Sequence, residues 1–385
     1  MPLKRWAFEA AAIAVALLIL GYMLTVLIDV RNMTLPNGQP MFGDFTAFWS
    51  AGRMTLDGHV AEVHGRELIE QYQHAATPDV RYFAPYNSPP PFLFIACALA
   101  LMPYAVSGVV FLVSTFAFFL YAMRKLLPDN RALIFAATAP AVVYQAGTLQ
   151  SLLLIAGINA LALHWLDKRP RLAGALVGLL IIKPHLAILW PIFLAFSRRW
   201  TAFIAASVSL LTLVLAAGLA FGFESYVRFF ENLSDSQSMI SGLRITTPAY
   251  ASLYANLLSL GLPQTVASAA HAASAVAAVA IAARLFVRGN RAIAGAAFCA
   301  ATLLISPYLF FYDFMLLMVG AALLGRPRDN FERAALILTW ATGLTVVIGA
   351  YVALPLCPLA AWLVLIAAMR RAGSAAPRLA QAQHT

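Results

Sequence analysis

A succession of apolar segments is the feature that most constrains how this chain can fold. Residues 7–28 are apolar except for Glu9, and further apolar segments occupy residues 91–102, 106–123, 132–144, 151–166, 172–182, 186–196, 201–221, 265–286, 292–305, 309–324, 334–353 and 359–369. Charged residues make up 11% of the chain, whereas soluble domains carry about 25%. The sequence therefore predicts an all-α polytopic membrane protein, a single integral membrane domain over residues 1–385 with about 10–13 transmembrane helices.

The basic residues predict which ends of these helices face the cytoplasm. The net charge of +10 comes mostly from short Lys and Arg clusters between apolar segments, as in cytoplasmic loops, so it does not indicate nucleic-acid binding. Lys4 and Arg5 precede residues 7–28, and about 22 residues suffice to cross a bilayer. This places residues 29–88 in a first external loop and residues 222–250 in a second. Residues 91–123 contain two apolar segments. If residues 29–88 are external and Arg124 and Lys125 are cytoplasmic, this stretch must cross the membrane an odd number of times. Either one segment is therefore re-entrant, or Arg124 and Lys125 are external.

An acidic residue opens the first external loop. Asp44 follows Gly43 and precedes three aromatic residues, Phe45, Phe48 and Trp49. A carboxylate can accept a proton from a hydroxyl group, and apolar neighbours raise its basicity. Asp44 is thus a candidate general base at a membrane surface. The alternative is structural, since an Asp at this position can cap the N-terminus of a helix that begins at Phe45.

Other unusual polar residues fall at the predicted outer ends of apolar segments. Gln150 directly precedes the segment at residues 151–166, Lys183 and His185 flank Pro184 between two short segments, and Asp313 lies near the outer end of another. Arg244 belongs to the second external loop. Charges at membrane depth are costly and therefore indicate function.

Each of these residues also has an interpretation that involves no catalytic or binding role. Lys183 can extend to a lipid headgroup, and Asp313 can form a structural ion pair with Arg244 or Lys183. Three first-loop residues could bind a metal, although such residues on a surface helix are more often solvated: His59, Glu62 and His64. No metal site is predicted, and a requirement for a divalent metal is left open.

Several motifs resemble those of a known family. Asp44 to Arg53 resembles Asp-Phe-x-x-Phe/Tyr-Trp-x-Ala-Gly-Arg, and Tyr86 to Phe92 resembles Tyr-x-x-Pro-Pro-Phe/Leu. Lys183-Pro184-His185 resembles Lys-Pro-Gln, and Pro307-Tyr308 with Tyr312-Asp313 resembles Pro-Tyr-x-x-x-Tyr-Asp. In their order and spacing these motifs resemble the polyprenyl-phosphate-sugar-dependent glycosyltransferases of the GT87 kind, within the C-type glycosyltransferase superfamily. The departures at His64, Leu149, His185 and Phe311 affect the expected sugar and acceptor rather than the Asp44 region.

The resemblance implies transfer of a sugar, such as mannose or another hexose, from a polyprenyl-phosphate carrier to an envelope glycan or glycolipid acceptor. The active site would face the periplasm or exterior of the plasma (inner) membrane, with Asp44 as the base. The predicted substrate-binding residues are Arg53, Trp49, Tyr86, Gln150, Lys183, His185, Arg244 and Asp313. Among them Arg53, Lys183 and Arg244 are the candidates for holding the phosphate. Membrane lipid is the other expected partner.

Two other classes of function remain open at this point. A transporter or flippase for a lipid-linked or envelope precursor would also need charges at membrane depth and broken helices, although no internal repeat relates the two halves of the sequence. A structural protein of an envelope polymer system would use Asp44 only as a helix cap. A measurement of polyprenyl-phosphate-sugar turnover distinguishes the three classes, because only the enzyme would consume this donor.

Overall fold

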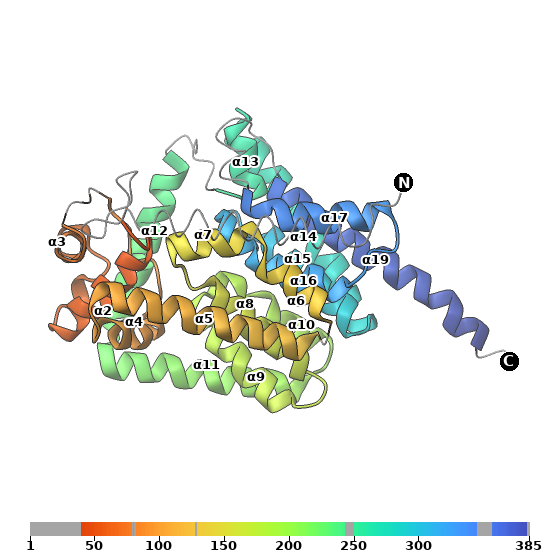
Figure 1. The fold of residues 1–385 in the computed structure, drawn as a ribbon, viewed down its shortest axis with the longest axis horizontal. Helices are drawn as coiled ribbons and strands as arrows, with labels where there is room; N and C mark the ends of the chain where they lie inside the picture. Colours follow the sequence, from red (N-terminus) through yellow and green to blue (C-terminus); the bar gives the residue numbers. More distant parts are fainter. Residues whose placement is uncertain are drawn as a thin grey trace.

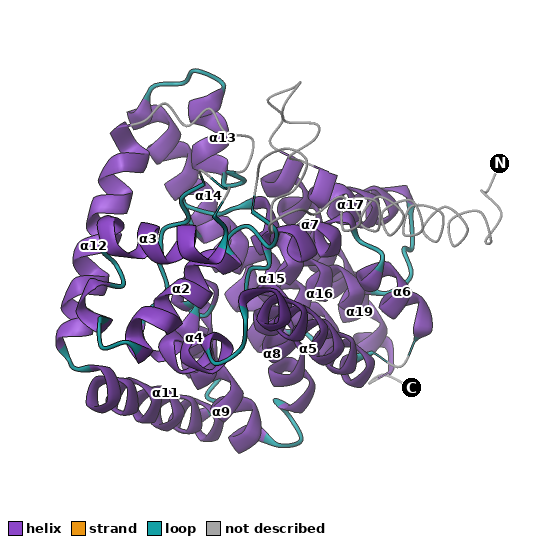
Figure 2. Cartoon of the chain, turned by 60° about the vertical axis from the view of Figure 1, so that its left-hand side comes forward, coloured by secondary structure: helices purple, strands orange, loops and turns teal. Residues whose placement is uncertain are grey.

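The computed structural model describes residues 40–78, 80, 82–127, 129–242, 250–344 and 356–382. The predicted first helix at residues 7–28, the Lys4 and Arg5 pair and Arg244 lie outside these residues. Helices make up most of the described chain (Figures 1 and 2), which has one isolated bridge, between Tyr250 and Phe310, and no strand. The prediction of an all-α polytopic membrane protein is confirmed.

The α-helices are α2 (Phe45–Leu56), α3 (Arg66–Ala76), α4 (Leu93–Ala100), α5 (Tyr104–Leu126), α6 (Asn130–Ala137), α7 (Pro140–Thr148), α8 (Leu152–Trp165), α9 (Pro170–Leu179), α10 (Leu189–Phe196), α11 (Trp200–Phe221), α12 (Glu224–Gly242), α13 (Leu253–Ser259), α14 (Gln264–Arg288), α15 (Arg291–Ile305), α16 (Met315–Leu324), α17 (Asn330–Ala341) and α19 (Leu356–Ala382). Short 3₁₀ turns interrupt them, namely η1 (Val60–Glu62), η2 (Pro90–Phe92), η3 (Leu180–Ile182), η4 (Pro184–Leu186), η5 (Phe311–Phe314) and η6 (Thr342–Leu344).

Long and short apolar helices occupy different places in the bundle. Among the described residues, four helices are long and apolar enough to cross a membrane: α5, α11, α14 and residues 356–374 of α19. The outer faces of two of these carry exposed apolar side chains, such as Leu219 on α11 and Val276 on α14. By contrast, every residue of α16 is buried. The long helices therefore supply a lipid-facing perimeter, and the shorter ones include the core.

Small residues let the bundle close tightly where helices cross. On α9, a Cβ atom on Gly174 would lie 2.2 Å from the carbonyl oxygen of Ala202 on α11. One turn later, a Cβ on Gly178 would lie 2.6 Å from the carbonyl oxygen of Ala206. This spacing of small residues is a common way for membrane helices to associate, because it brings the backbones into contact.

Helix α4 bears on the question of which segment is re-entrant. Together η2 and α4 contain 11 residues in the range 90–100, a length of about 16 Å, which is too short to cross a bilayer. The segment instead packs on α2, where a Cβ on Gly52 would meet the carbonyl oxygen of Ala96 at 2.0 Å. In the last turn of the following helix, α5, Lys125 is close enough to interact electrostatically with His164. Lys168 and Arg291 interact with the same histidine. Lys125 therefore shares an end of the bundle with two other basic clusters, which favours the re-entrant alternative.

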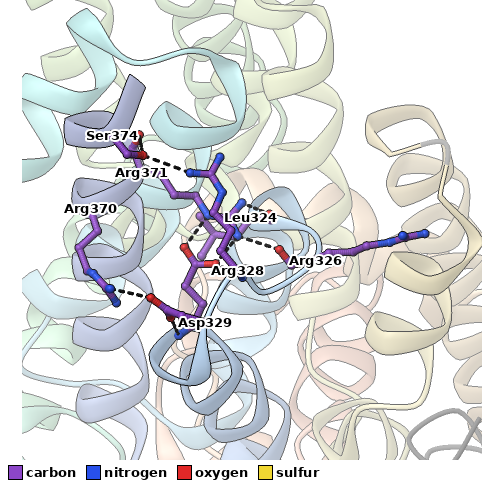
Figure 3. A network of polar contacts seen from close by, with 8 residues as sticks. Leu324, Arg326, Arg328, Asp329, Arg370, Arg371 and Ser374 are labelled. Carbon is purple, nitrogen blue, oxygen red and sulfur yellow. Dashed lines mark hydrogen bonds and ion pairs between the residues drawn. The ribbon is translucent and has the colours of Figure 1, made fainter. Parts of the chain in front are cut away.

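The C-terminal basic clusters also meet at one place (Figure 3). Arg371 on α19 forms an ion pair with Glu332 on α17, with 2.6 Å between Nη2 and Oε2. Arg370 pairs with Asp329, again at 2.6 Å. In Figure 1, α2, α3 and α12 lie at the left of the view, while the C-terminal part of α19 projects at the right. The polar first loop and this basic network are thus at opposite ends of the molecule.

Candidate active site

The carboxylate of Asp44 is held by two side chains from distant parts of the chain. Its Oδ1 accepts a hydrogen bond from the Tyr82 hydroxyl at 3.0 Å, and its Oδ2 accepts one from the Gln150 amide at 2.8 Å. The side chain makes no capping hydrogen bond to helix α2, which begins at the next residue. The cap interpretation is therefore wrong, and Asp44 instead faces Tyr82 and Gln150.

Unusual backbone conformations position this carboxylate. Phe42 and Gly43, just before Asp44, have φ angles of 66° and 24°, and Leu149, just before Gln150, has a φ of 54°. A Cβ on Gly43 would lie 3.3 Å from the Cα of Thr148, so the two turns are in close contact. Left-handed conformations in residues such as Phe and Leu are costly and are concentrated at functional sites. The chain thus accepts strain on both sides of the Asp44–Gln150 contact.

A buried ion pair lies beside this contact. Lys183 stands between η3 and η4, at the break in the chain that its neighbour Pro184 imposes. Its Nζ lies 3.1 Å from Oδ1 of Asp313, and the side-chain exposures are 14% for the lysine and 2% for the aspartate. The other oxygen of Asp313 accepts a hydrogen bond from the backbone N–H of Phe310 at 2.9 Å. Of the two partners that the sequence suggested for Asp313, Lys183 is in contact with it, and Arg244 lies outside the described residues.

Tyr312 lies near both Asp44 and Asp313. The Nζ of Lys183 lies 5.2 Å from the centre of its ring. Asp44, Asp313 and Tyr82 all interact electrostatically with its hydroxyl group. Tyr312 is buried and stacks on Phe310 with 5.1 Å between ring centres. Tyr312 is therefore close to both the Asp44 carboxylate and Lys183.

The Tyr82 hydroxyl remains a donor over the physiological pH range. Burial, and then the negative charge of Asp44 and its hydrogen bond, raise the pKa of Tyr82 well above its ordinary value. The phenol consequently stays protonated and continues to donate to Asp44.

Tyr86 lies deeper than predicted for a substrate-binding residue. It is 2% exposed, and its hydroxyl has no hydrogen-bond partner within the described ranges. The ring of His64 packs against it, tilted by 33° with 5.3 Å between ring centres, and Nδ1 of His64 lies 2.9 Å from the Tyr86 carbonyl oxygen. Burial lowers the pKa of His64, so its ring is neutral at physiological pH. Asn232 of α12 donates to the side chain of Asn87 at 2.8 Å and thereby fixes α12 over this part of the loop.

Arg53 and Trp49 are turned away from the cluster. Arg53 is nine residues beyond Asp44, about 13 Å along the helix axis, and pairs with Asp57 at 2.8 Å. The indole N–H of Trp49 donates to the carbonyl oxygen of Met102 at 2.9 Å, which fastens the turn between α4 and α5. Their roles in substrate binding stay predictions, and their contacts are those of residues that hold α2 in place.

His185 and the remaining candidates complete the set. His185 is half-buried and follows Lys183 and Pro184 into η4, and its Nε2 atom is enclosed without a hydrogen-bond partner among the residues described. Arg244 is not among those residues. In the described part of the chain, no three His, Cys, Asp or Glu side chains are grouped so as to hold a metal ion.

Sequence reasoning missed Tyr82 and the role of Tyr312. Tyr312 directly precedes Asp313 in a motif that was recognised, so its proximity to the ion pair was open to inference. Tyr82 lies in a non-helical stretch with no periodic pattern, and no local signal distinguishes it from the nearby Tyr72, which donates to Asp57 instead.

Comparison with known proteins gives one match. The model of glycosyltransferase family 87 matches residues 86–307, which is more than half of the chain. No curated protein matches the sequence, and no solved structure matches it. The matched range includes Gln150, Lys183 and His185 and ends shortly before Asp313.

Proposed function

Because this chain belongs to glycosyltransferase family 87, we propose that it transfers a sugar from a polyprenyl-phosphate carrier to an envelope glycan or glycolipid acceptor. Asp44 is the general base of this reaction. The observation that carries the proposal is the anchoring of a half-buried carboxylate by Tyr82 and Gln150, next to the Lys183–Asp313 pair.

Asp44 takes the proton of the acceptor hydroxyl. As that hydroxyl oxygen forms a bond to the anomeric carbon of the sugar, the bond from this carbon to the carrier phosphate breaks, and the proton passes to the carboxylate. Each carboxylate oxygen has two lone pairs. The hydrogen bonds from Tyr82 and Gln150 use one on each oxygen, which leaves a position for the incoming hydroxyl.

Lys183 stabilises the leaving group. The departing polyprenyl phosphate carries negative charge, and a cation placed where this charge develops lowers the barrier. Lys183 is the partly exposed member of its ion pair, at 14% against 2% for Asp313. An ammonium group has three N–H donors, so Lys183 can bind a phosphate oxygen without releasing Asp313.

The charge distribution supports a reaction at the external face of the membrane. Lys125, Lys168 and Arg291 approach one another around His164, and such basic clusters mark the cytoplasmic side. Asp44 belongs to the opposite end of the bundle, so the reaction is expected on the periplasmic or exterior side of the plasma (inner) membrane. A lipid-linked hexose such as mannose is a donor that is accessible there.

Turnover of a defined donor tests the reaction. Purified protein in lipid nanodiscs is incubated with a set of polyprenyl-phosphate hexoses and extracted envelope lipids, and release of the polyprenyl phosphate is measured. We expect Asp44→Asn to lose about 10²–10⁴-fold in kcat, the usual contribution of a general base, with donor binding retained. Equal turnover by parent and Asp44→Asn would remove Asp44 from the mechanism, and transport of an intact donor would support the flippase alternative.

Thiol labelling tests the sidedness. His59 in the first loop and Lys168 at the basic end are both exposed, so each can be replaced by Cys in a variant that lacks Cys97, Cys299 and Cys357. In intact cells or spheroplasts, a membrane-impermeant reagent should label His59→Cys at once and Lys168→Cys only after permeabilisation. The reverse pattern would place Asp44 in the cytoplasm and contradict a lipid-linked donor.

A further inference from the structure

A cavity opens where helices α9 and α11 separate. The two helices are in backbone contact at Gly174 and Gly178. Helix α9 then ends at Leu179, and the chain turns through η3 and breaks at Lys183, while α11 continues straight. The space between them has a volume of about 330 Å³, at the lower end of the range for small-molecule pockets.

Two polar residues, His185 and Ser207, interrupt an otherwise apolar lining of this cavity, and we call the part formed by His185 its polar end. Its walls include Val177, Ile181, Phe203 and Leu210, and Ile188 on its rim is 52% exposed. The cavity therefore opens on the outer surface of the bundle, between helices that are apolar enough to face lipid. A hydrocarbon chain can enter it directly from the bilayer.

His185 supplies the polar end. It lines the cavity, and its Nε2 atom is enclosed with no hydrogen-bond partner in the described part of the chain. A buried polar atom left unpaired costs about 1–3 kcal/mol, so its retention points to a ligand that completes the bond. Lys183 and Asp313 are near enough to interact electrostatically with the imidazole. The polar end of the cavity thus adjoins the ion pair of the candidate active site.

We propose that this cavity binds the first isoprene units of the carrier lipid, with Nε2 of His185 hydrogen-bonded to its phosphate ester. This inference rests on the proposed function and adds the subsite for the hydrocarbon chain. The rest of the chain leaves the cavity past its exposed rim at Ile188. A phosphate bonded directly to a hydrocarbon matches the abrupt change from apolar lining to His185 and Lys183, whereas a glycerophospholipid interposes glycerol and ester groups.

Filling the cavity tests the subsite. Ser207 lines it from α11, whereas the adjacent Val208 does not and is 58% exposed. We expect Ser207→Phe to weaken binding of undecaprenyl phosphate at least about tenfold, because each buried methylene contributes roughly fourfold to a binding constant. Val208→Phe, the matched control, should bind like the parent. Native mass spectrometry of the purified protein in detergent measures the bound lipid directly.

Two substitutions at His185 test the polar end. His185→Leu should weaken binding of undecaprenyl phosphate while leaving binding of undecaprenol, which has no phosphate, unchanged. His185→Gln restores an amide donor and should retain most of the affinity for the phosphate. A purely structural role for His185 would instead change the binding of both lipids together.

The outcomes separate the subsite from the reaction. Undecaprenyl phosphate binding by Ser207→Phe equal to that of the parent would overturn the subsite, even if the protein turns over a donor. Parallel loss of phosphatidylglycerol binding would also overturn it, since the cavity would then hold ordinary membrane lipid. Selective loss of undecaprenyl phosphate binding would support the subsite even if no sugar transfer were detected, a result that would count against the proposed reaction alone.

Discussion

Two ion pairs are buried to a similar degree at opposite ends of this molecule, yet their surroundings differ. At the basic end, Arg371 and Glu332 have side-chain exposures of 11% and 5%. At the end that contains Asp44, Lys183 and Asp313 have exposures of 14% and 2%. Burial alone therefore does not distinguish them, and the difference lies in how many of their hydrogen bonds are made.

The basic-end pair is saturated. Arg371 donates to both oxygens of Glu332, at 2.8 and 2.6 Å, and to the carbonyl oxygens of Leu324 and Arg326. Glu332 also accepts from the backbone N–H of Arg328 at 2.6 Å. A charge pair with this many partners compensates for its desolvation and joins α17 to α19. Figure 3 shows the polar contacts around Arg371. The described residues thus use four of the five N–H donors of Arg371, which leaves little capacity for a ligand.

The Lys183 pair is unsaturated. Within the described residues, Lys183 contacts one carboxylate oxygen and the face of one aromatic ring, although an ammonium group has three donors. Nearby, Nε2 of His185 is unpaired. Natural proteins rarely leave such groups unsatisfied. Unmet hydrogen-bonding capacity, rather than buried charge, is thus what distinguishes the proposed binding site from a structural ion pair.

Breaking the saturated pair should have the largest effect on stability. Arg371→Met leaves Glu332 buried without its partner, which typically costs about 3–5 kcal/mol. Arg370→Met is the matched control, because the Arg370–Asp329 pair is 46% and 41% exposed, and exposed pairs contribute about 0–1 kcal/mol. Denaturant unfolding in detergent measures both, and equal stability of the two variants would show that the network is not structural.

Breaking the unsaturated pair should affect ligand binding more than folding. Lys183→Met/Asp313→Leu removes both charges, so neither is left buried alone, and the free energy of unfolding should change by less than for Arg371→Met. Binding of undecaprenyl phosphate should weaken by about 10–100-fold, the value of a hydrogen bond to a charged group. If the double variant binds like the parent, the pair is structural and the comparison fails.

The smallest effect is expected at Tyr82. Tyr82→Phe removes one of the two donors to Asp44, and a net hydrogen bond is worth about 0.5–1.5 kcal/mol, or roughly 2–12-fold in kcat. Tyr72→Phe is the control, because the Tyr72 hydroxyl donates to Asp57 away from the cluster. Steady-state rates with saturating donor compare the two variants, and equal kcat values would contradict a role for Tyr82 in orienting Asp44.

The fold class and part of the site were predictable because hydropathy and charge act locally. Apolar segments and basic clusters require no knowledge of tertiary contacts, and membrane-depth charges such as Lys183 and Asp313 stand out in any apolar sequence. Arg53 and Trp49 were grouped with Asp44 because they share a motif, but successive helical residues turn by about 100°, so neighbours in sequence face different directions. The contact between Asp44 and Gln150 spans 106 residues, and no local pattern encodes it.

The break at Lys183 has a consequence for the bilayer itself. The apolar helices on either side of it occupy residues 170–182 and 184–196, about 20 Å each, against a hydrocarbon core of about 30 Å. A membrane accommodates such hydrophobic mismatch by thinning around the short segments. The bilayer is therefore expected to be locally thinner next to the Lys183 break, which shortens the distance that a lipid headgroup must travel to reach this lysine.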